Sequence, residues 1–452
     1  MHIAMTEPLF AWNCLQDCPS LQTLKQWLAA VPDATLLEGL RQHRGRGRND
    51  YPVHVLWGVV LLTIALRHTS YQACLDELRR NEGLRRLIGL AEPAGVPDKW
   101  NLSRFLDVLG QEPHLSQLRR VFDAMIQRLG AVVDNLGKHT AGDATALHAR
   151  RKGQAGAGQE AAEGLAQPAG GRKEYTNEQG EVTRVIEWFG YKLHLLVDVR
   201  HEVALAYQVT SANGDDGKTL PALVEQAQGN LPKGRMDSLA YDKAADSGDV
   251  HQTLDAAGIR PVIQNRCLWK DHAEEMLPGH DGRSNITYDE AGTLYCYDRI
   301  SEPPVRHRMA CIGHEPQRKT IKYRCPARHE GWTCPSESLC NAGKDYGKTV
   351  RVDRTIDLRR FPPIPRATKK FERLYKGRTA VERTNARLKL FWGIDDGNVT
   401  GARRFHALVG AVMLVHAGFA TLLAAAPRRE GTLGKLHLGH VQKVLAAQIG
   451  SG

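Results

Sequence analysis

The chain has 452 residues, of which 42% are apolar and 25% are charged. These proportions are typical of globular proteins and exclude a wholly disordered chain, a collagen-like protein and a coiled-coil rod. The 61 lysines and arginines outnumber the 50 aspartates and glutamates, and the resulting net charge of +11 indicates a polyanionic partner.

Residues 1–130 are expected to form a helical domain that binds DNA. Four segments have apolar residues at three- and four-residue spacing, which is typical of helices packed on a core: Pro52–His68, Tyr71–Leu90, Asn101–Leu109 and His114–Leu129. The basic cluster Arg41–Arg48 precedes them. A solvated loop and a DNA contact are both compatible with this cluster.

Residues 131–266 change to a period of two, which indicates strands. Strands and helices are predicted in this order: strands Lys138–His148, Trp188–Val199 and Val203–Thr210, a helix from Leu220, strand Ser238–Asp242, helix Asp249–Ala257 and strand Pro261–Gln264. Ala149–Glu181, rich in Gly, Ala, Gln and Lys, is predicted to be a flexible loop. The order indicates an α/β fold with a mixed sheet and flanking helices, and it matches an RNase H-like core without excluding other mixed folds.

Residues 267–355 break this pattern and contain six of the nine cysteines. We interpret them as a Cys- and His-containing insertion that divides the core into two parts. Residues 356–426 return to helical spacing through Lys370–Trp392 and Arg404–Ala425, and they are expected to complete the core.

The stretch Ala407–Ala425 is nearly long enough to span a membrane. It is interrupted by His416 and no second such stretch supports it, so we predict a buried helix and no membrane contact. The basic tail, residues 427–452, is expected to end in a short helix at His440–Ile449.

Cysteine usage indicates a reducing compartment. Nine is an odd number, and Cys14, Cys18 and Cys74 lie far from the other six, whereas a secreted chain would be expected to pair them all. Met1–Ser20 has neither a basic start nor a long apolar core, so a signal peptide is not predicted. We therefore expect a cytoplasmic protein associated with the nucleoid.

Two acids lie where a sheet can hold a metal ion. Asp143 is inside the first predicted strand, and Asp242 ends the strand SLAYD. From position alone, a turn or helix-cap role is the simpler interpretation of either residue. Asp198, also on a predicted strand, is a rival to Asp143.

A third acid, Glu382, lies on the predicted helix Leu374–Lys389. At 100° per residue, four polar residues share a face about 60° wide: Tyr375, Arg378, Glu382 and Lys389. Three apolar residues form an adjoining stripe that can pack on a sheet: Leu374, Val381 and Leu388. An ordinary amphipathic helix with an Arg378–Glu382 ion pair is the alternative interpretation.

The spacing of these four polar residues resembles the Y-R-E-K signature of bacterial insertion-sequence transposases of the DDE class. Three longer segments are also similar to parts of these enzymes, in the expected order: Val53–Leu90, Gly190–Glu225 and Ala240–Arg266. Two features depart from the family. Ala245 stands where a Tyr is common, and the Ala149–Glu181 loop is longer than expected.

The resemblance implies an RNase H-like catalytic core with two groups of site residues. The catalytic residues, which would hold two Mg²⁺ (or Mn²⁺) ions, are Asp143, Asp242 and Glu382. The residues that would bind DNA are Tyr375, Arg378 and Lys389. Carboxylates suit such hard cations, and two ions can support both hydrolysis and strand transfer of a phosphodiester.

The implied function is DNA transposition. The protein would cut at transposon ends and join the 3′-OH to target DNA, acting on double-stranded terminal inverted repeats as a homodimer assembled on DNA. One alternative is an inactive or domesticated transposase that only binds inverted repeats. Another is a simple RNase H-like nuclease, which would hydrolyse DNA without joining it.

The cysteines of the insertion are candidate ligands for a structural zinc ion. The set predicted from the sequence is Cys311, Cys325, Cys334 and Cys340, with two histidines able to complete a site: His314 and His329. The spacing contains no C-x2-C knuckle, and unpaired thiols are the alternative.

Overall fold

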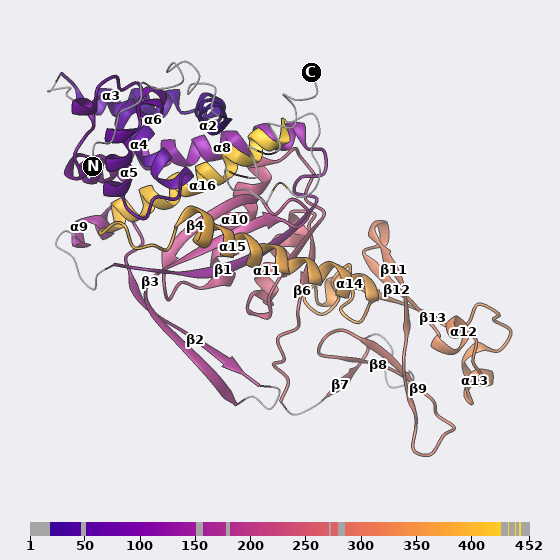
Figure 1. Cartoon of the computed structure of the whole chain (residues 1–452). Helices are drawn as coiled ribbons and strands as arrows, with labels where there is room; N and C mark the ends of the chain where they lie inside the picture. The colour runs from indigo at the N-terminus through magenta and orange to yellow at the C-terminus, as the bar shows by residue number, and fades with distance from the viewer. Residues whose placement is uncertain are drawn as a thin grey trace, which may run out of the picture.

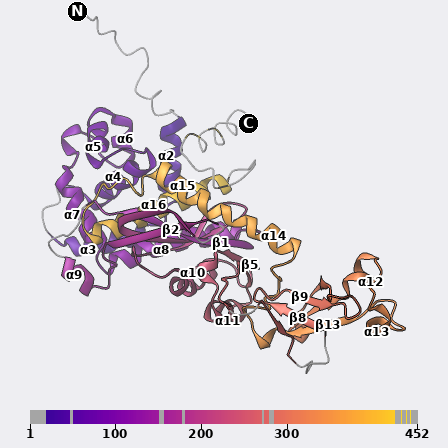
Figure 2. The same cartoon turned by 90° about the horizontal axis from the view of Figure 1, so that it is seen from below.

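The computed structural model describes residues 19–46, 51–150, 157–177, 181–270, 273–278 and 285–425, together with residues 433, 439 and 443. A helical region lies at one end of the molecule, a mixed sheet in the middle and a set of small sheets at the other end (Figures 1 and 2). Arg48 and the predicted tail helix His440–Ile449, apart from Lys443, lie outside the described residues.

The N-terminal region is helical, as predicted. Its α-helices are α2 (Pro19–Ala30), α3 (Ala34–Arg44), α4 (Val53–Ala65), α5 (Tyr71–Arg80), α6 (Glu82–Leu87), α7 (Lys99–Leu109) and α8 (His114–Val132), with a 3-10 turn η1 (Pro93–Gly95). The segment predicted as one helix over Tyr71–Leu90 is broken at Asn81. The Asn81 side chain accepts a hydrogen bond from the Leu84 backbone N–H (3.1 Å) and so begins a new helix.

The central sheet follows the predicted order of elements. It comprises β1 (His139–His148), β3 (Val182–Asp198), β4 (Ala204–Ser211), β5 (Ser238–Tyr241) and β6 (Arg260–Ile263), with α10 (Asp216–Asn230), η2 (Lys243–Ala245) and α11 (Gly248–Ala256) between them. The spatial order is β4-β3-β1-β5-β6. β3 is antiparallel to β1 and β4, whereas β5 is parallel to β1 and β6. This mixed α/β arrangement is of the RNase H-like type.

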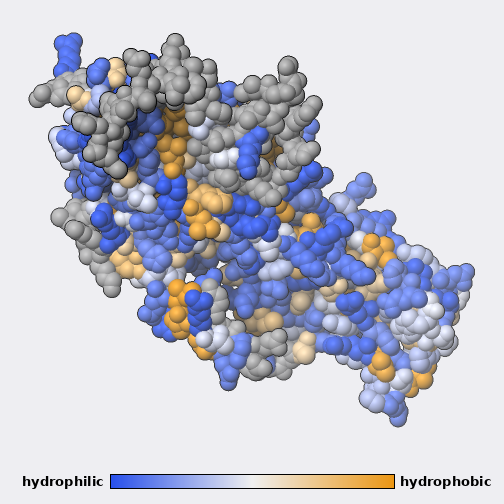
Figure 3. Space-filling model, in the orientation of Figure 1, coloured by the Kyte–Doolittle hydropathy of each residue, from blue (hydrophilic) through white to orange (hydrophobic). Residues whose placement is uncertain are grey.

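The prediction of a flexible loop over Ala149–Glu181 is wrong for much of the segment. It contains α9 (Ala157–Ala162) and β2 (Ala169–Thr176), which pairs with the first half of β3. The two strands form a hairpin that extends beyond the core sheet (Figure 1). Residues 170–174 of β2 are mostly exposed, so this strand needs no apolar alternation, which is why the sequence pattern missed it. The exposed Val182 and Val185 lie on the hairpin, where Figure 3 shows an apolar patch.

The insertion consists of two small sheets around a separate apolar cluster. One sheet has the order β10 (Arg306–Arg308), β9 (Leu294–Tyr297), β8 (Ile286–Asp289), β7 (Glu274–Met276), and the other β11 (Ala310–Glu315), β12 (Thr320–Arg324), β13 (Thr349–Asp353). The short helices are η3 (Pro316–Arg318), α12 (Pro326–Glu330), α13 (Glu337–Asn341) and η4 (Arg354–Ile356). Because its buried cluster includes Ile286, Tyr323 and Val352 but none of the central sheet, the insertion has its own core.

A buried carboxylate ties both ends of the insertion to the central sheet. Asp246 accepts hydrogen bonds from His251 Nε2 (2.9 Å), the Arg266 backbone N–H (2.8 Å) and the guanidinium groups of Arg359 and Arg366. Burial opposes ionisation, but the bonds from His251 and the arginines hold the pKa of Asp246 below its usual value. The segments before and after the insertion therefore meet at one point.

The C-terminal part comprises α14 (Lys369–Tyr375), η5 (Lys376–Arg378), α15 (Thr379–Trp392) and α16 (Ala402–Ala424). The single helix predicted from Leu374 is tightened to a 3-10 turn at η5. At Gly377 within this turn, an added Cβ would lie 2.8 Å from Val199 Cγ1. Glycine therefore lets the chain approach the end of β3 closely.

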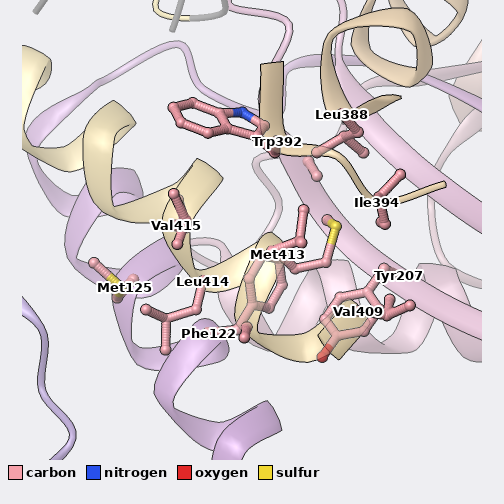
Figure 4. Close-up of a cluster of buried hydrophobic side chains, with 14 of the residues drawn as sticks. Phe122, Met125, Tyr207, Leu388, Trp392, Ile394, Val409, Met413, Leu414 and Val415 are labelled. Carbon is pink, nitrogen blue, oxygen red and sulfur yellow. The ribbon is translucent and has the colours of Figure 1, made fainter. Parts of the chain in front are cut away.

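Helix α16 runs through the middle of the hydrophobic core. Figure 4 shows its side chains Val409 and Met413 among Phe122 of α8, Tyr207 of β4 and Trp392 of α15. Among the described residues it is the one helix long and apolar enough to cross a membrane, but most of it is buried in the protein. The prediction of a buried helix over Ala407–Ala425 is confirmed, and one core joins the helical region, the sheet and α15.

Candidate active site

The first two acids come from neighbouring strand segments, since Asp143 lies on β1 and Asp242 directly follows β5. The parallel register pairs Ala141 of β1 with Ala240 of β5, so that two residues further along each chain Asp143 and Asp242 stand at the same level. One carboxylate oxygen of each is fixed by a backbone N–H, from Ala144 and Ala244 respectively (2.9 Å each). The other oxygen of Asp143 contacts the Arg378 guanidinium (3.4 Å).

The charge of Asp143 is only partly compensated. Its side chain is 18% exposed, and burial raises its pKa to about 6, with Asp242 adding to the rise. The Ala144 backbone N–H, Arg378 and Lys173 of β2 oppose this shift. A carboxyl that is costly to ionise next to another acid is typical of a site that receives a cation.

Arg378 connects the third acid to the first. Its guanidinium donates to Glu382 Oε1 (2.5 Å) and to Asp143 Oδ2 (3.4 Å). The Arg378–Glu382 ion pair expected of an ordinary amphipathic helix is therefore present. Arg378 in addition contacts Asp143 on the sheet. The apolar stripe packs as predicted, since Val381 and Leu388 are buried and Leu374 is partly buried against the core.

Tyr375 and Lys389 lie at opposite ends of this helical segment. The Tyr375 hydroxyl donates to Gln264 Oε1 (3.1 Å). Burial raises the pKa of Tyr375, Arg378 lowers it, and Asp242 and Asp143 raise it, so the phenol lies within electrostatic reach of both acids. Lys389 instead donates to the Ala146 carbonyl of β1 (2.5 Å) and pairs with Asp395 (3.1 Å).

The structure thus brings together five of the six predicted residues: Asp143, Asp242, Tyr375, Arg378 and Glu382. The sixth, Lys389, lies apart from them on α15, beside Ala146 of β1. Residues 135–417 match the model of a family described as the transposase DDE domain. The chain belongs to the DDE transposase family. No curated protein matches it significantly.

The matched region of this transposase runs from the turn before β1 to the middle of α16 and includes the insertion. DDE transposases generally use divalent metals such as Mg²⁺ and act on DNA. In the part of this transposase that the structure describes, no three His, Cys, Asp or Glu side chains stand close enough to hold a metal ion. As placed, Asp143 and Glu382 are bridged by Arg378.

Asp198, the rival for the first acid, has a structural role in this transposase. It is 1% exposed and lies at the far end of β3, opposite Thr140 rather than Asp143. Its carboxylate accepts hydrogen bonds from the backbone N–H groups of Gly137 (2.7 Å) and His201. The residue therefore organises the turn after β3 and does not face the other acids.

One positioning contact of the transposase was not predicted from the sequence. Glu202, in the turn between β3 and β4, has a positive φ of 55° and a buried side chain. It accepts hydrogen bonds from Arg383 (2.7 Å) and Arg387, and its carbonyl accepts one from Thr384 (3.2 Å), all on α15. The predicted strands Trp188–Val199 and Val203–Thr210 left a short connection at this position, but its partner could not be predicted because it depends on how α15 packs.

Proposed function

We propose that the protein is an active DNA transposase that cuts at transposon ends and joins the freed 3′-OH to target DNA. The observation that supports the proposal is the common level of Asp143 on β1 and Asp242 directly after β5, with Glu382 linked to Asp143 through Arg378. Two of these carboxylates come from neighbouring strand segments and the third from α15, with Arg378 between Asp143 and Glu382.

The donor set suits hard divalent cations, because carboxylate oxygens are the ligands that Mg²⁺ prefers. We assign Asp143, Asp242 and Glu382 as the residues that hold two Mg²⁺ (or Mn²⁺) ions. When bound, the ions would activate a water or 3′-OH and stabilise the charge on the phosphate and leaving oxygen. Glu382 is half exposed and separates from Arg378 in this assignment, which frees the guanidinium for a DNA phosphate.

The remaining signature residues are assigned to DNA. Tyr375 and Arg378 lie beside the acids, where they would contact the transposon end near the cleaved phosphate. Lys389 of α15 lies beside Ala146 of β1 and would contact the DNA backbone of the same end. The net charge of +11 favours such a polyanionic partner.

A transposition event acts on two ends, so we propose that the active species is a homodimer on DNA. Each protomer would supply a complete set of acids. Helix α15 is held on its own sheet by Val381 and Leu388 and by its bonds to Glu202, and needs no partner to reach Asp143. Partners would be the terminal inverted repeats and target DNA.

Incubation of the protein with DNA carrying the ends of its element tests the function. We expect strand cleavage at the ends and joined products in Mg²⁺ or Mn²⁺, and neither product in EDTA. Binding without cleavage would instead support an inactive or domesticated transposase that recognises inverted repeats. Cleavage without joining would support a simple nuclease.

Removing Lys389 is expected to weaken binding to transposon-end DNA and reduce the salt dependence of that binding. Lys389→Ala should lower the slope of log K against log salt by about one unit, as for the loss of one phosphate contact. Fluorescence anisotropy over a range of salt concentrations measures this slope.

Lys233→Ala is the matched control, because Lys233 is exposed and precedes β5, at the opposite end of that strand from Asp242. Its slope should equal that of the wild type. If Lys389→Ala leaves the slope unchanged, Lys389 only supports Asp395 and the end of β1.

A further inference from the structure

Four cysteines of the insertion surround one small cavity. Cys296 lies on β9, Cys325 immediately before α12, Cys334 in the following loop and Cys340 on α13. All four line a cavity of about 30 Å³, together with side chains that include His307 and Lys348. None of the four forms a disulfide bond.

Strand pairing and turns bring these cysteines together from positions far apart in the sequence. Cys296 pairs with His307 of β10, and the backbone N–H of Cys325 donates to the Lys348 carbonyl (2.8 Å), which precedes β13. The Cys334 carbonyl accepts a hydrogen bond from the Glu337 N–H (3.0 Å) at the start of α13. Sequence spacing without a C-x2-C knuckle is therefore no obstacle to a shared site.

The thiols also form one electrostatic group. Burial raises the pKa of Cys296 to about 12, and the nearby Cys325, Cys334 and Cys340 add to the rise, whereas Lys348 opposes it. Two sulfurs already accept hydrogen bonds: Cys325 Sγ from Asn341 Nδ2 (3.5 Å) and Cys334 Sγ from the Ser336 backbone. Such donors stabilise a sulfur that carries negative charge.

The zinc ligand set predicted from the sequence needs a correction. Cys311 lies on β11, paired with Tyr323 in the other small sheet, and it lines a different cavity together with His329. His314 is surrounded electrostatically by Arg354, Asp255 and Arg260 rather than by the thiols. The fourth cysteine of the group is therefore Cys296.

We propose that Cys296, Cys325, Cys334 and Cys340 bind one structural zinc ion in this cavity. Four thiolate ligands are a common tetrahedral set for structural zinc. Binding would release the four thiol protons and leave a complex of charge −2, which Lys348 partly offsets. No three of these side chains stand close enough in the structure to share a metal ion, so the thiols would turn about their Cα–Cβ bonds to meet it.

A zinc ion at this site would connect parts of the insertion that otherwise share few apolar contacts. The cluster of buried side chains in the insertion includes Cys296 at its border but no residue of α12 or α13. A zinc ion would fasten these two helices to β9. This site is independent of the proposed DNA chemistry, since it lies outside the acids and their helix.

The test is metal analysis of the full-length protein purified without chelator, by mass spectrometry of the elements. We expect one zinc per chain in the wild type and in Asp143→Asn, and less than about half in Cys296→Ser or Cys340→Ser. Cys311→Ser is the matched control and should keep its zinc. Replacement by Co²⁺ should give the intense thiolate-to-metal absorption of a site with four cysteine ligands, weakened in Cys296→Ser.

Several outcomes would overturn the proposal. One is a wild type that contains no zinc and binds no Co²⁺, and another is the detection of these four cysteines in disulfide bonds by mass spectrometry. Zinc lost from Cys311→Ser but kept in Cys296→Ser would restore the original ligand set. If Cys296→Ser fails to fold, the Co²⁺ spectrum of the wild type still decides between a thiolate site and free thiols.

Discussion

Asp143→Asn is expected to abolish DNA cleavage, lowering the rate by at least about 10³-fold, or about 4 kcal/mol in the activation barrier. Asparagine keeps the size of the side chain and one oxygen for the Ala144 N–H, but it loses the charge that would hold the metal ions. Asp242→Asn should have the same effect because Asp242, directly after β5, stands at the same level as Asp143. Binding to transposon-end DNA should persist, since it depends mainly on cations elsewhere.

The assay compares cleavage of labelled end DNA with its binding by the same protein preparation. Asp249→Asn is the matched control, because Asp249 is an exposed acid in the first turn of α11 and is not one of the proposed ligands. Asp198→Asn is unsuitable as a control, since the buried Asp198 carboxylate accepts hydrogen bonds from two backbone N–H groups and its loss would disturb the fold. Cleavage by Asp143→Asn at the wild-type rate in Mg²⁺ would refute the assignment.

Glu382→Gln is expected to stop two reactions at once: cleavage of the donor end and joining of a pre-cleaved 3′-OH end to target DNA. Glutamine can keep a hydrogen bond to Arg378 but loses the charge that would help to fix the second metal ion. Because both steps would use the same ions, we expect each to fall by about 10²-fold or more, which is about 3 kcal/mol.

Supplying the pre-cleaved end separates the two reactions in one experiment. The control is Glu372→Gln, since Glu372 is an exposed acid of α14 that pairs with nearby Lys376 in a contact of 3.0 Å. The control should join DNA at the wild-type rate. If Glu382→Gln does the same, then Glu382 is not a ligand and its pair with Arg378 is purely structural.

The sheet was predictable from the sequence because its strands are buried. β3 and β4 carry runs such as Leu193–Val197 and Ala204–Tyr207 that are buried without a break, so these segments are rich in apolar residues. β2 was not predictable, because its exposed residues give no apolar period. The spacing of apolar residues along a sequence reflects which side chains are buried. A strand that pairs outside the core buries few side chains and therefore has no such spacing.

The candidate site was predictable to the extent that it depends on local periodicity. Helical geometry placed Arg378 and Glu382 on one face, and the structure agrees. Contacts made by the fold itself were missed. Glu202 finds its partners only when α15 packs, and Cys296 joins the other thiols only after the strands of the insertion pair.

The anchoring of the insertion at Asp246 makes its length independent of the catalytic geometry. The Arg359 guanidinium donates to the Arg266 carbonyl (2.6 Å), so the chain leaves the core and returns to it at adjacent positions. The chain between them is the insertion, which is held to the core at Asp246, four residues after Asp242, and by an ion pair of Arg354 with Asp255 of α11 (2.7 Å). The insertion can therefore become longer or shorter, or be replaced by a short linker, without separating β5 from β1. Changes in length between Arg266 and Arg359 are thus compatible with the same catalytic core.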